Sequence, residues 1–594
     1  MSEIDERFKK LGVANFIELA LIIPKDYEDL TLHNHITPSS HLLIDATINS
    51  INRAKSTLQI SFFAHNLDMV IQGVIFNPKP YMYHQFIVGD RGYFYGTLLS
   101  KNSFYSISMP KKVTQIGSIV PKYKATIRTD ILQKFIKQHL SLESLLDEGL
   151  KEDVAKTLLE LHFPQTKPPK ELDAKTLYAL KFAELYNHMK NLSQKRRYYP
   201  AILENHKDYH KWLSSLPFLL TDEQLMAIED IKNDFSKKVA ARRVIVGDVG
   251  SGKTMVILAS AYMNYPSKSI LMAPTTILAN QLFEEAQKYL PFMKIALVTN
   301  KTKTLNLDEY DFLIGTHALL YRELFEASLI MVDEQHRFGT QQRNKLDRLT
   351  SDGAKKAHFL QFSATPIPRT QAMIESAYVD VSLITSTPFK KDITTTIIRK
   401  ADFKNLIEHI KLELSKNNQV LLVYPLVEQS DVLEYQSISE ARGFWEKYFD
   451  DVYVTYGSDK AKESVLLEFR EKGSILIATT VVEVGISLPK LSTVVIVGAE
   501  RLGLSTLHQL RGRVSRTGLK GYCYLYTNLK DSSRLERFCT TTNGFDIAEL
   551  DLEFRKSGDL LKGTNQSGKE FVWVDLATDT NIVKDVKDQL NIIS

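Results

Sequence analysis

A glycine-rich turn in the chain has the residue types that bind nucleotide phosphates. Residues 244–254 read VIVGDVGSGKT, with Gly247, Gly250 and Gly252. Phosphates need free backbone N–H groups at a helix start, and glycines let the backbone approach them. Lys253 is expected to reach the β- and γ-phosphates, and the Thr254 hydroxyl to bind Mg²⁺. A chance glycine turn is the alternative, but the strand-like run before it and the helical MVILASAYM after it favour an ATP site.

A pair of carboxylates follows a second hydrophobic run. The segment SLIMVDE ends in Asp333 and Glu334. One carboxylate can hold Mg²⁺ while its neighbour orients or deprotonates the attacking water, so the pair indicates hydrolysis rather than nucleotide storage. An acidic pair at a strand end is by itself more often a solvated turn. With the phosphate-binding turn upstream, hydrolysis is the favoured interpretation.

Both motifs need parallel strands to position them. After Pro217, apolar strand-like runs alternate with helical segments. VIVGD, SILMAP, KIALVT, DFLIGT, SLIMVDE and AHFLQFSAT read as buried strands, and QVLLVYP, VYVTYG, SILIATT, TVVIVGAE and YCYLYT form a second set. Apolar strands that alternate with helices predict parallel sheets covered on both faces. The polar segment TSTPFKKDITTT between the sets is interpreted as a hinge, which predicts two doubly wound α/β lobes.

The N-terminal part of the chain has a different pattern of residues. Residues 1 to about 40 read as short helices with PKDYED as an exit turn, and residues from about 42 to 115 hold short β-branched runs between Gly, Asn and Pro turns. These runs predict a small all-β barrel or sandwich. A helical stretch then ends in the basic aromatic cluster KRRYY at 195–199, which is interpreted either as a duplex-DNA contact or as a helix end with solvated charge.

Composition sets the broad class. The chain has 594 residues, of which 44% are hydrophobic and 24% charged, and its net charge is +5. These values are ordinary for a multidomain globular protein and permit a polyanionic partner without demonstrating one. Cys523 and Cys539 lack a CxxC spacing and cannot form a four-cysteine zinc site. The sequence indicates neither export nor membrane insertion, so we expect a cytoplasmic location.

Seven motifs occur in the order known from superfamily 2 helicases: GDVGSGKT, MAPTTILANQ, GTHALL, DEQHRFG, SATPIPRT, VVEVGISLP and LHQLRGRVSRTG. The residues of these motifs resemble those of the RecG family of branched-DNA translocases. The resemblance implies a multidomain α/β protein with two RecA-like motor lobes, preceded by a small all-β OB-fold-like wedge module and a helical linker. It implies domains at 1–41 (N-terminal helices), 42–120 (wedge), 121–200 (linker), 201–387 (ATP-binding lobe), 388–530 (second lobe) and 531–594 (translocation motif and tail).

The same resemblance assigns roles around the nucleotide. Gln224 matches the adenine-reading glutamine, with Phe218 as a stacking neighbour. In QLRGRVSR, Arg513 and Arg516 match the arginines that reach across the lobes toward the γ-phosphate. Such a finger stabilises charge that is present only in the transition state. The alternative for an arginine-rich patch is plain phosphate binding to nucleic acid.

Small polar residues at strand ends are expected to follow the DNA backbone without reading bases. Ser363 and Thr365 of SATPIPRT match the segment that couples ATP state to strand binding in the family. The other residues of this groove are Thr275, Thr276, Thr316, His317 and Thr479.

Two aromatic residues are candidates for contact with the branch point. The segment VIFNPKPYMY resembles a strand and loop of the family's wedge, and it contains Phe76 and Tyr81. Bases stack on exposed aromatic rings with about 1 to 3 kcal/mol each. The alternative is that both rings belong to the barrel core, as aromatic residues of β strands usually do.

The segment RFCTTTNGFDIAELDLEFRKSGDLLKGTNQSG near the C-terminus resembles the TRG motif shared by RecG and Mfd. In that motif a helical hairpin and loop convert lobe motion into duplex translocation, and Arg555 and Gln566 match its arginine and glutamine. Composition alone indicates a loose surface tail. Departures from the family pattern fall at Thr276, Ser487, Ser515 and Asn565.

The resemblance implies a monomeric DNA helicase that depends on ATP and Mg²⁺ and acts on branched double-stranded DNA such as stalled forks and Holliday junctions, with R-loops as a further substrate. A single-stranded-DNA-binding protein is a candidate partner. An Mfd-like transcription-repair translocase shares the motor but needs a polymerase-binding domain, and PriA-like helicases carry cysteine zinc sites. A nucleotide-dependent DNA-binding or remodelling protein without unwinding activity is the alternative from another class; it would not need the full set of metal, base and arginine residues.

Overall fold

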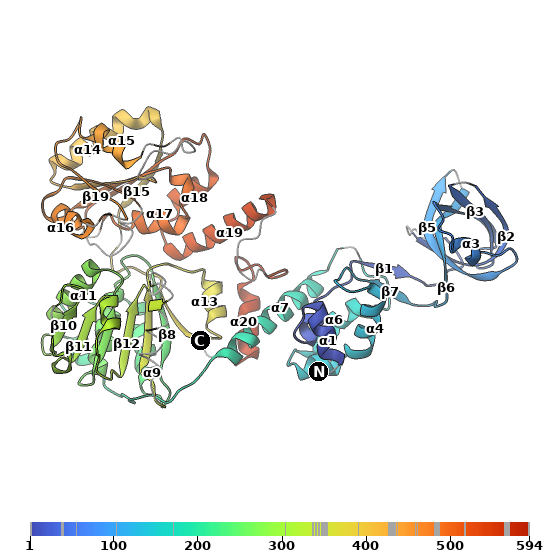
Figure 1. Cartoon of the computed structure of the whole chain (residues 1–594), viewed down its shortest axis with the longest axis horizontal. Coiled ribbons are helices and arrows are strands. Elements are labelled where there is room, and N and C mark those ends of the chain that lie inside the picture. Colours follow the sequence, from blue (N-terminus) through green and yellow to red (C-terminus); the bar gives the residue numbers. More distant parts are fainter. Residues whose placement is uncertain are drawn as a thin grey trace. The chain divides into compact units, whose positions relative to one another are not determined.

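The computed structural model describes residues 3–591 apart from gaps at 37–40, 55, 102–103, 170, 303–304, 335–337, 339–340, 343–344, 346–353, 390, 426–434, 436, 458, 460, 480–487, 516–517 and 563–570. The chain forms two compact units, and their elements are labelled in Figure 1. The first unit comprises Met1–His188 and Glu570–Val574, and the second comprises Met189–Lys569 and Asp575–Ser594.

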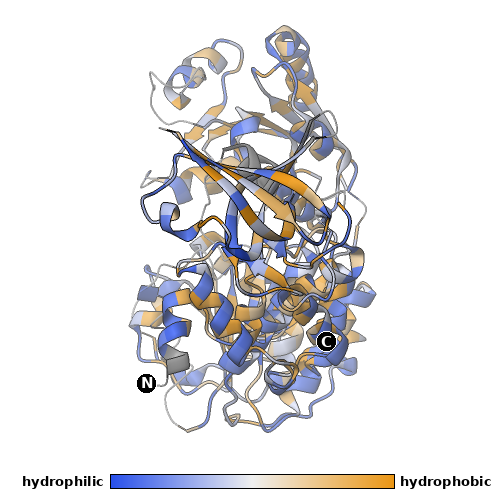
Figure 2. Ribbon diagram, turned by 90° about the vertical axis from the view of Figure 1, so that its right-hand side faces the viewer, coloured by the Kyte–Doolittle hydropathy of each residue, from blue (hydrophilic) through white to orange (hydrophobic). Residues whose placement is uncertain are grey.

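The first unit contains a closed barrel whose strands pair in the order β2-β3-β4-β6-β5. Along β3, buried and more exposed residues alternate, which is the period of a strand with one face in a core. Figure 2 shows hydrophobic and hydrophilic residues interspersed along such strands. Ile44, Phe62 and Phe94 belong to the core. The expected all-β module is therefore confirmed. Its elements are β2 (His41–Arg53), β3 (Thr57–Ala64), β4 (Met69–Phe76), α3 (Met82–Gln85), β5 (Arg91–Lys101) and β6 (Phe104–Val113).

Helices and a two-stranded sheet make up the rest of the first unit. The segment PKDYED was expected to be a turn, but DYED forms β1 (Asp26–Asp29), which pairs antiparallel with β7 (Ile119–Lys122). A local pattern does not reveal such a strand because its partner comes from a distant part of the chain. The helices are α1 (Glu3–Leu11), α2 (Phe16–Ala20), α4 (Thr129–His139), α5 (Leu142–Asp147), α6 (Glu152–His162) and α7 (Ala174–Lys195).

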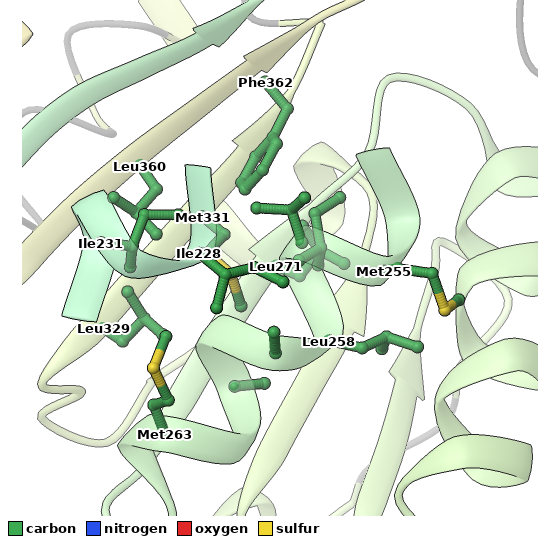
Figure 3. Close-up of a cluster of buried hydrophobic side chains, with 14 of the residues drawn as sticks. Ile228, Ile231, Met255, Leu258, Met263, Leu271, Leu329, Met331, Leu360 and Phe362 are labelled. Carbon is green, nitrogen blue, oxygen red and sulfur yellow. The ribbon is translucent and has the colours of Figure 1, made fainter. Parts of the chain in front are cut away.

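The second unit begins with a parallel α/β lobe, here called lobe 1. Its strands pair in the order β10-β11-β9-β12-β13-β8-β14, and every neighbouring pair is parallel. The strand β12 is buried along its whole length, as expected for a sheet with helices on both faces. In the core of this lobe, Leu360 and Phe362 of the sheet pack with Ile228 of the helix α9 (Figure 3).

The elements of lobe 1 are α8 (His210–Leu213), α9 (Asp222–Phe235), β8 (Arg242–Gly247), α10 (Lys253–Asn264), β9 (Ser269–Met272), α11 (Thr276–Tyr289), β10 (Ile295–Val298), η1 (Leu307–Glu309), β11 (Phe312–Gly315), η2 (His317–Tyr321), β12 (Leu329–Asp333), β13 (His358–Ser363), α13 (Arg369–Glu375) and β14 (Asp380–Ile384). Because all strands run the same way, their carboxyl ends share one edge of the sheet, called the C-terminal edge below, and their starts share the opposite, N-terminal edge.

Lobe 2 repeats this design. Its strands pair in the order β15-β20-β19-β16-β18-β17, again all parallel. Its elements are β15 (Ile393–Ile398), η4 (Lys400–Asp402), α14 (Phe403–Ser415), β16 (Gln419–Val423), α15 (Ile438–Trp445), β17 (Val452–Thr455), α16 (Lys462–Lys472), β18 (Ile475–Ala478), β19 (Leu491–Val497), η6 (Ala499–Arg501), α17 (Leu504–Arg511) and β20 (Gly521–Tyr526). The predicted fold class, two doubly wound parallel lobes with an all-β module before them, is confirmed.

Three helices follow lobe 2: α18 (Ser533–Thr540), α19 (Gly544–Lys562) and α20 (Thr580–Gln589). The helix α19 packs against α17, and α18 and α19 form a helical hairpin (Figure 1). The helix α20 lies against α13 of lobe 1, where the Thr580 and Thr370 hydroxyls are 3.2 Å apart. In the described part of the chain, no helix has the length and apolar character that a membrane crossing requires.

Candidate functional site

The glycine-rich turn, Gly247–Thr254, connects β8 to α10 at the C-terminal edge of lobe 1 and is called the P-loop below. Gly252 precedes the first residue of α10 and has a left-handed backbone, with φ of 75°. A Cβ atom at this position would also collide with the amide of Gln224. Only glycine combines this conformation with such close packing, so the loop leaves its N–H groups at the helix start open to an anion.

Lys253 is already aimed across the P-loop. Its Nζ donates hydrogen bonds to the carbonyl oxygens of Gly247, at 2.8 Å, and Asp248, at 3.0 Å. These bonds fold the long side chain back over the loop, so the ammonium group lies where phosphate oxygens bind in such motifs.

Asp333 and Glu334 lie at the end of β12, and both side chains are buried. Glu334 has a left-handed backbone, with φ of 53°, and its Oε1 accepts a 2.6 Å hydrogen bond from the N–H of Ala364. Asp333 Oδ1 has no hydrogen-bond partner among the described residues. Burial and the neighbouring charge of Glu334 raise the pKa of Asp333 to about 7. A buried carboxylate oxygen without a donor, in a cavity that Thr254 also lines, fits a divalent cation.

A cavity of about 390 Å³ joins these groups to lobe 2. Lys253, Asp333 and Glu334 line it from lobe 1, and Arg513 and Ser515 line it from lobe 2. The volume is that of a small-molecule site. Ser515, one of the predicted departures from the family pattern, occupies a left-handed conformation, with φ of 63°. Such a conformation costs a non-glycine residue roughly 1 to 2 kcal/mol.

The two expected adenine contacts do not line this cavity. Gln224 is buried, its Oε1 accepts from the N–H of Thr221 at 2.8 Å, and its Nε2 donates to the carbonyl of Ser251 at 2.7 Å. Its amide thus caps α9 and supports the P-loop. Phe218 is partly exposed and makes an edge contact with Tyr289. Both positions stay predictions as nucleotide contacts.

The expected groove residues all lie at C-terminal edges. Thr275 caps α11 after β9, and Thr316 caps η2 after β11. Ser363 ends β13, and Thr479 follows β18 in lobe 2. Thr365 Oγ1 accepts a 3.0 Å hydrogen bond from Gln509 Nε2 of lobe 2. Thr276 begins α11 and His317 begins η2.

A buried network that the sequence patterns did not single out connects the P-loop to the C-terminal hairpin. The Asp248 carboxylate accepts a 2.9 Å hydrogen bond from the N–H of Gly544 and lies 2.5 Å from His508 Nε2. The Arg511 guanidinium donates to His508 Nδ1 at 3.1 Å and to the Thr541 carbonyl at 2.8 Å. Asp248 and His508 belong to the motifs GDVGSGKT and LHQLRGRVSRTG, but only the fold brings them together.

The partners of His508 determine where its proton lies. Arginine only donates, so His508 Nδ1 must accept and Nε2 must carry the proton that is shared with Asp248. Burial lowers the pKa of His508, and its bond to Asp248 opposes that shift. Burial alone would raise the pKa of Asp248, but the bonds from His508 and the N–H of Gly544 lower it to about 2. Asp248 is therefore an ionised carboxylate with its donors in place.

The remaining predicted residues lie elsewhere. Phe76 ends β4 and Tyr81 precedes α3, and each side chain is 53% exposed, so neither ring belongs to the barrel core. Arg555 lies on α19, but its side chain is outside the described residues. Arg516, Gln566, Ser487 and Asn565 also lie outside them.

Comparison with known proteins defines the class of this site. The DEAD/DEAH box helicase family model matches residues 221–374, and the model of the helicase conserved C-terminal domain matches residues 401–518. The first range falls within lobe 1 and the second within lobe 2. Together, the lobes and the motifs define a superfamily 2 helicase motor.

Full-length relatives give the family. The chain is 45% identical to the ATP-dependent DNA helicase RecG of Helicobacter pylori strain J99, over 99% of this chain and 97% of that protein. It is 31% identical to RecG of Streptococcus pneumoniae, over 99% of this chain and 94% of that protein. A structure of RecG bound to a three-way DNA junction matches with a TM-score of 0.58 and 26% identity, covering 99% of this chain and 84% of that one. The chain belongs to the RecG family.

Proposed function

We propose that this protein is an ATP-dependent translocase that remodels branched double-stranded DNA. The observation that carries the proposal is the cavity shared by the lobes, where the P-loop and the Asp333–Glu334 pair of lobe 1 meet Arg513 of lobe 2. A site built from two lobes can couple hydrolysis to their relative motion. The family membership and the likeness to RecG on a three-way junction support branched DNA as the substrate.

Each residue of the cavity has one task in this proposal. Lys253 exchanges its two carbonyl partners for phosphate oxygens, since charge-assisted bonds are stronger. Thr254 and Asp333 hold Mg²⁺, which when bound neutralises charge on the phosphates. Glu334 orients and deprotonates the attacking water. Arg513 stabilises the charge that develops on the transferred phosphoryl group, with Arg516 as a second arginine.

Movement requires a path from the nucleotide to the DNA. The Asp248 carbonyl contacts Lys253, and the Asp248 carboxylate contacts the first residue of α19. We infer that the nucleotide state reaches the hairpin through this residue. In the same proposal the threonines and serines at the C-terminal edges follow the backbone, Arg555 and Gln566 act on the duplex, and Phe76 and Tyr81 stack on parted bases.

ATP hydrolysis under three conditions tests the function. ATP turnover is measured without DNA, with linear duplex and with a model fork, together with unwinding of the fork. We expect the fork to stimulate turnover most and to be unwound only with ATP. Equal turnover under all three conditions, with intact fork binding, would instead favour a nucleotide-dependent DNA-binding protein that does not move.

The wedge assignment has its own test. Phe76→Ala should weaken fork unwinding by roughly tenfold, because one stacking contact is worth about 1 to 3 kcal/mol. Val70→Ala on the same strand is the matched control, since its side chain is also exposed, at 51%, but aliphatic. Equal losses in the two variants would show that Phe76 does not act at the branch point.

A further inference from the structure

Lobe 1 has a second and larger cavity, of about 780 Å³, at the N-terminal edge of its sheet. Arg242, the first residue of β8, and Phe359, its partner in β13, line it. The P-loop follows the other end of β8. This rear cavity is therefore separated from the nucleotide site by the length of the sheet, and no role in ATP hydrolysis explains it.

The basic aromatic cluster KRRYY forms one wall of the rear cavity. Backbone bonds fix this wall on two sides: the N–H of Ala240 donates to the Tyr199 carbonyl at 2.8 Å, and the N–H of Lys356 donates to the Pro200 carbonyl at 2.8 Å. The backbone at the end of the segment is thus bonded to two other parts of the lobe. The side chains of Lys195, the last residue of α7, and of Arg197 are exposed.

The lining of the rear cavity is strongly positive. It contains seven cationic residues and two carboxylates, an excess as large as the net charge of +5 of the whole chain. Three cations form ion pairs: Arg196 with Asp380, Lys237 with Asp234, and Arg243 with Asp234 and Asp230. The other four have no ion pair with any described residue. They are Lys195, Arg197, Arg242 and Lys356.

Two tyrosines lie among these cations. Lys356 Nζ is 3.4 Å from the ring centre of Tyr199, and the Arg196 guanidinium is 5.2 Å from that of Tyr198, whose side chain is 66% exposed. The hydrogen bond from Arg197, with the charge of Lys356 in addition, lowers the pKa of the Tyr199 hydroxyl. Cations beside flat rings suit a ligand that has phosphates next to sugars or bases.

We propose that the rear cavity binds the phosphate backbone of the DNA substrate. It would be a second DNA-binding site of lobe 1, at the edge of the sheet opposite the nucleotide site. Its volume exceeds what a single phosphate fills, and a strand offers successive phosphates to the four cations that lack carboxylate partners. Contacts of this kind carry no base specificity, which suits a branched substrate of any sequence. The inference rests on the proposed function only in taking DNA as the source of the phosphates.

A triple variant of the full-length protein tests this site. Arg197→Gln, Arg242→Gln and Lys356→Gln together remove three charges from the rear cavity. The control variant carries Lys404→Gln, Lys447→Gln and Lys472→Gln, which remove three exposed charges of lobe 2 outside the cavities described here. Binding of a fluorescent fork is measured by anisotropy at a series of salt concentrations.

Loss of three phosphate contacts should reduce the slope of log affinity against log salt by about 2.7, at about 0.9 per contact. We expect this loss, and roughly tenfold weaker binding at about 0.1 M salt, only in the cavity variant. Equal slopes and affinities in the two variants would overturn the proposal. A second result would also overturn it: the cavity variant binds the fork like the control but no longer binds inorganic tripolyphosphate or an oligoglutamate peptide. The cavity would then bind free polyphosphates or acidic protein segments instead of DNA.

A second measurement on the unaltered protein does not depend on the folding of a variant. Fork DNA should protect Lys195 and Lys356 from an amine-acylating reagent several-fold, and Lys404 should react equally with and without DNA. Equal labelling of all three would contradict the proposal. Fork-stimulated ATP hydrolysis by the same preparation separates the outcomes, because its absence would count against the proposed function and its presence without protection only against the rear cavity.

Discussion

Two buried aspartates of lobe 1 have opposite surroundings. Asp248, in the P-loop, is 4% exposed, and its carboxylate accepts hydrogen bonds from the N–H groups of Val249 and Gly544 and from His508. Asp333, at the end of β12, is 8% exposed, and its Oδ1 has no donor among the described residues. The pKa of the first is lowered to about 2 and that of the second is raised to about 7.

We interpret Asp248 as a structural contact between the P-loop, lobe 2 and α19, and Asp333 as a proposed cation ligand. A buried carboxylate with several donors is stable as an anion and fixes the groups that donate to it, here the first residue of α19 and a helix of lobe 2. A buried carboxylate with an oxygen that no donor reaches is less stable as an anion until a cation supplies the missing charge. Burial alone therefore does not indicate function, and the number of donors distinguishes the two cases.

The largest expected effect comes from removing the charge of Asp333. Asp333→Asn should reduce ATP turnover by about 10³-fold, because several kcal/mol of transition-state stabilisation depend on the metal that we propose this residue holds. The same variant should change the thermal unfolding midpoint of the metal-free protein less than Asp248→Asn does. Both quantities are measured on purified variants in the presence and absence of Mg²⁺.

The matched control for this change is Asp222→Asn, because Asp222 is an exposed aspartate of the same lobe. A loss of stability in Asp333→Asn equal to that in Asp248→Asn would mean that both carboxylates are structural, and the distinction would be wrong.

Motif order and strand rhythm were enough to predict the two lobes, the P-loop and the Asp333–Glu334 pair at a strand end. These features are local, since each depends on residues within one strand, turn or helix. The bond between Asp248 and Gly544 was not predictable in this way, because it depends on how lobe 2 and the hairpin fold back onto lobe 1. The same reason explains why the sequence did not reveal that KRRYY lines one cavity together with Arg242 and Lys356.

A methyl group at Gly544 should disturb the contact between Asp248 and α19 without changing any charge. A Cβ atom there would lie 2.5 Å from Asp248 Oδ1 and 2.7 Å from Pro366 Cγ, so Gly544→Ala must displace the hairpin from the P-loop. A hydrogen bond to a charged group is worth about 1.5 to 3 kcal/mol. We therefore expect forks unwound per ATP hydrolysed to fall by roughly ten- to a hundredfold.

Gly503→Ala is the control for this change, since a Cβ atom at Gly503 meets nothing within 4 Å. Parallel losses of hydrolysis and unwinding in Gly544→Ala would indicate damage to the ATP site rather than lost coupling. An unchanged ratio with normal hydrolysis would show that the Asp248–Gly544 bond does not transmit the nucleotide state.

The smallest expected effect is a pH dependence that belongs to Asp248 alone. Its pKa in the folded protein is about 2, below the ordinary 3.8, so its contribution to the free energy of unfolding is complete above about pH 4 and disappears as pH falls toward 2. The difference between these values corresponds to about 2 kcal/mol. Urea unfolding of the second unit within the full-length protein is followed by the fluorescence of the buried Trp212 and Trp445. It should show wild type more stable than Asp248→Asn by about 2 kcal/mol at pH 7. This gap should narrow between about pH 4 and pH 2. A gap that stays constant over this range would mean that the carboxylate is not held as an anion by its donors, and Asp248 would no longer differ from Asp333 in the way the comparison requires.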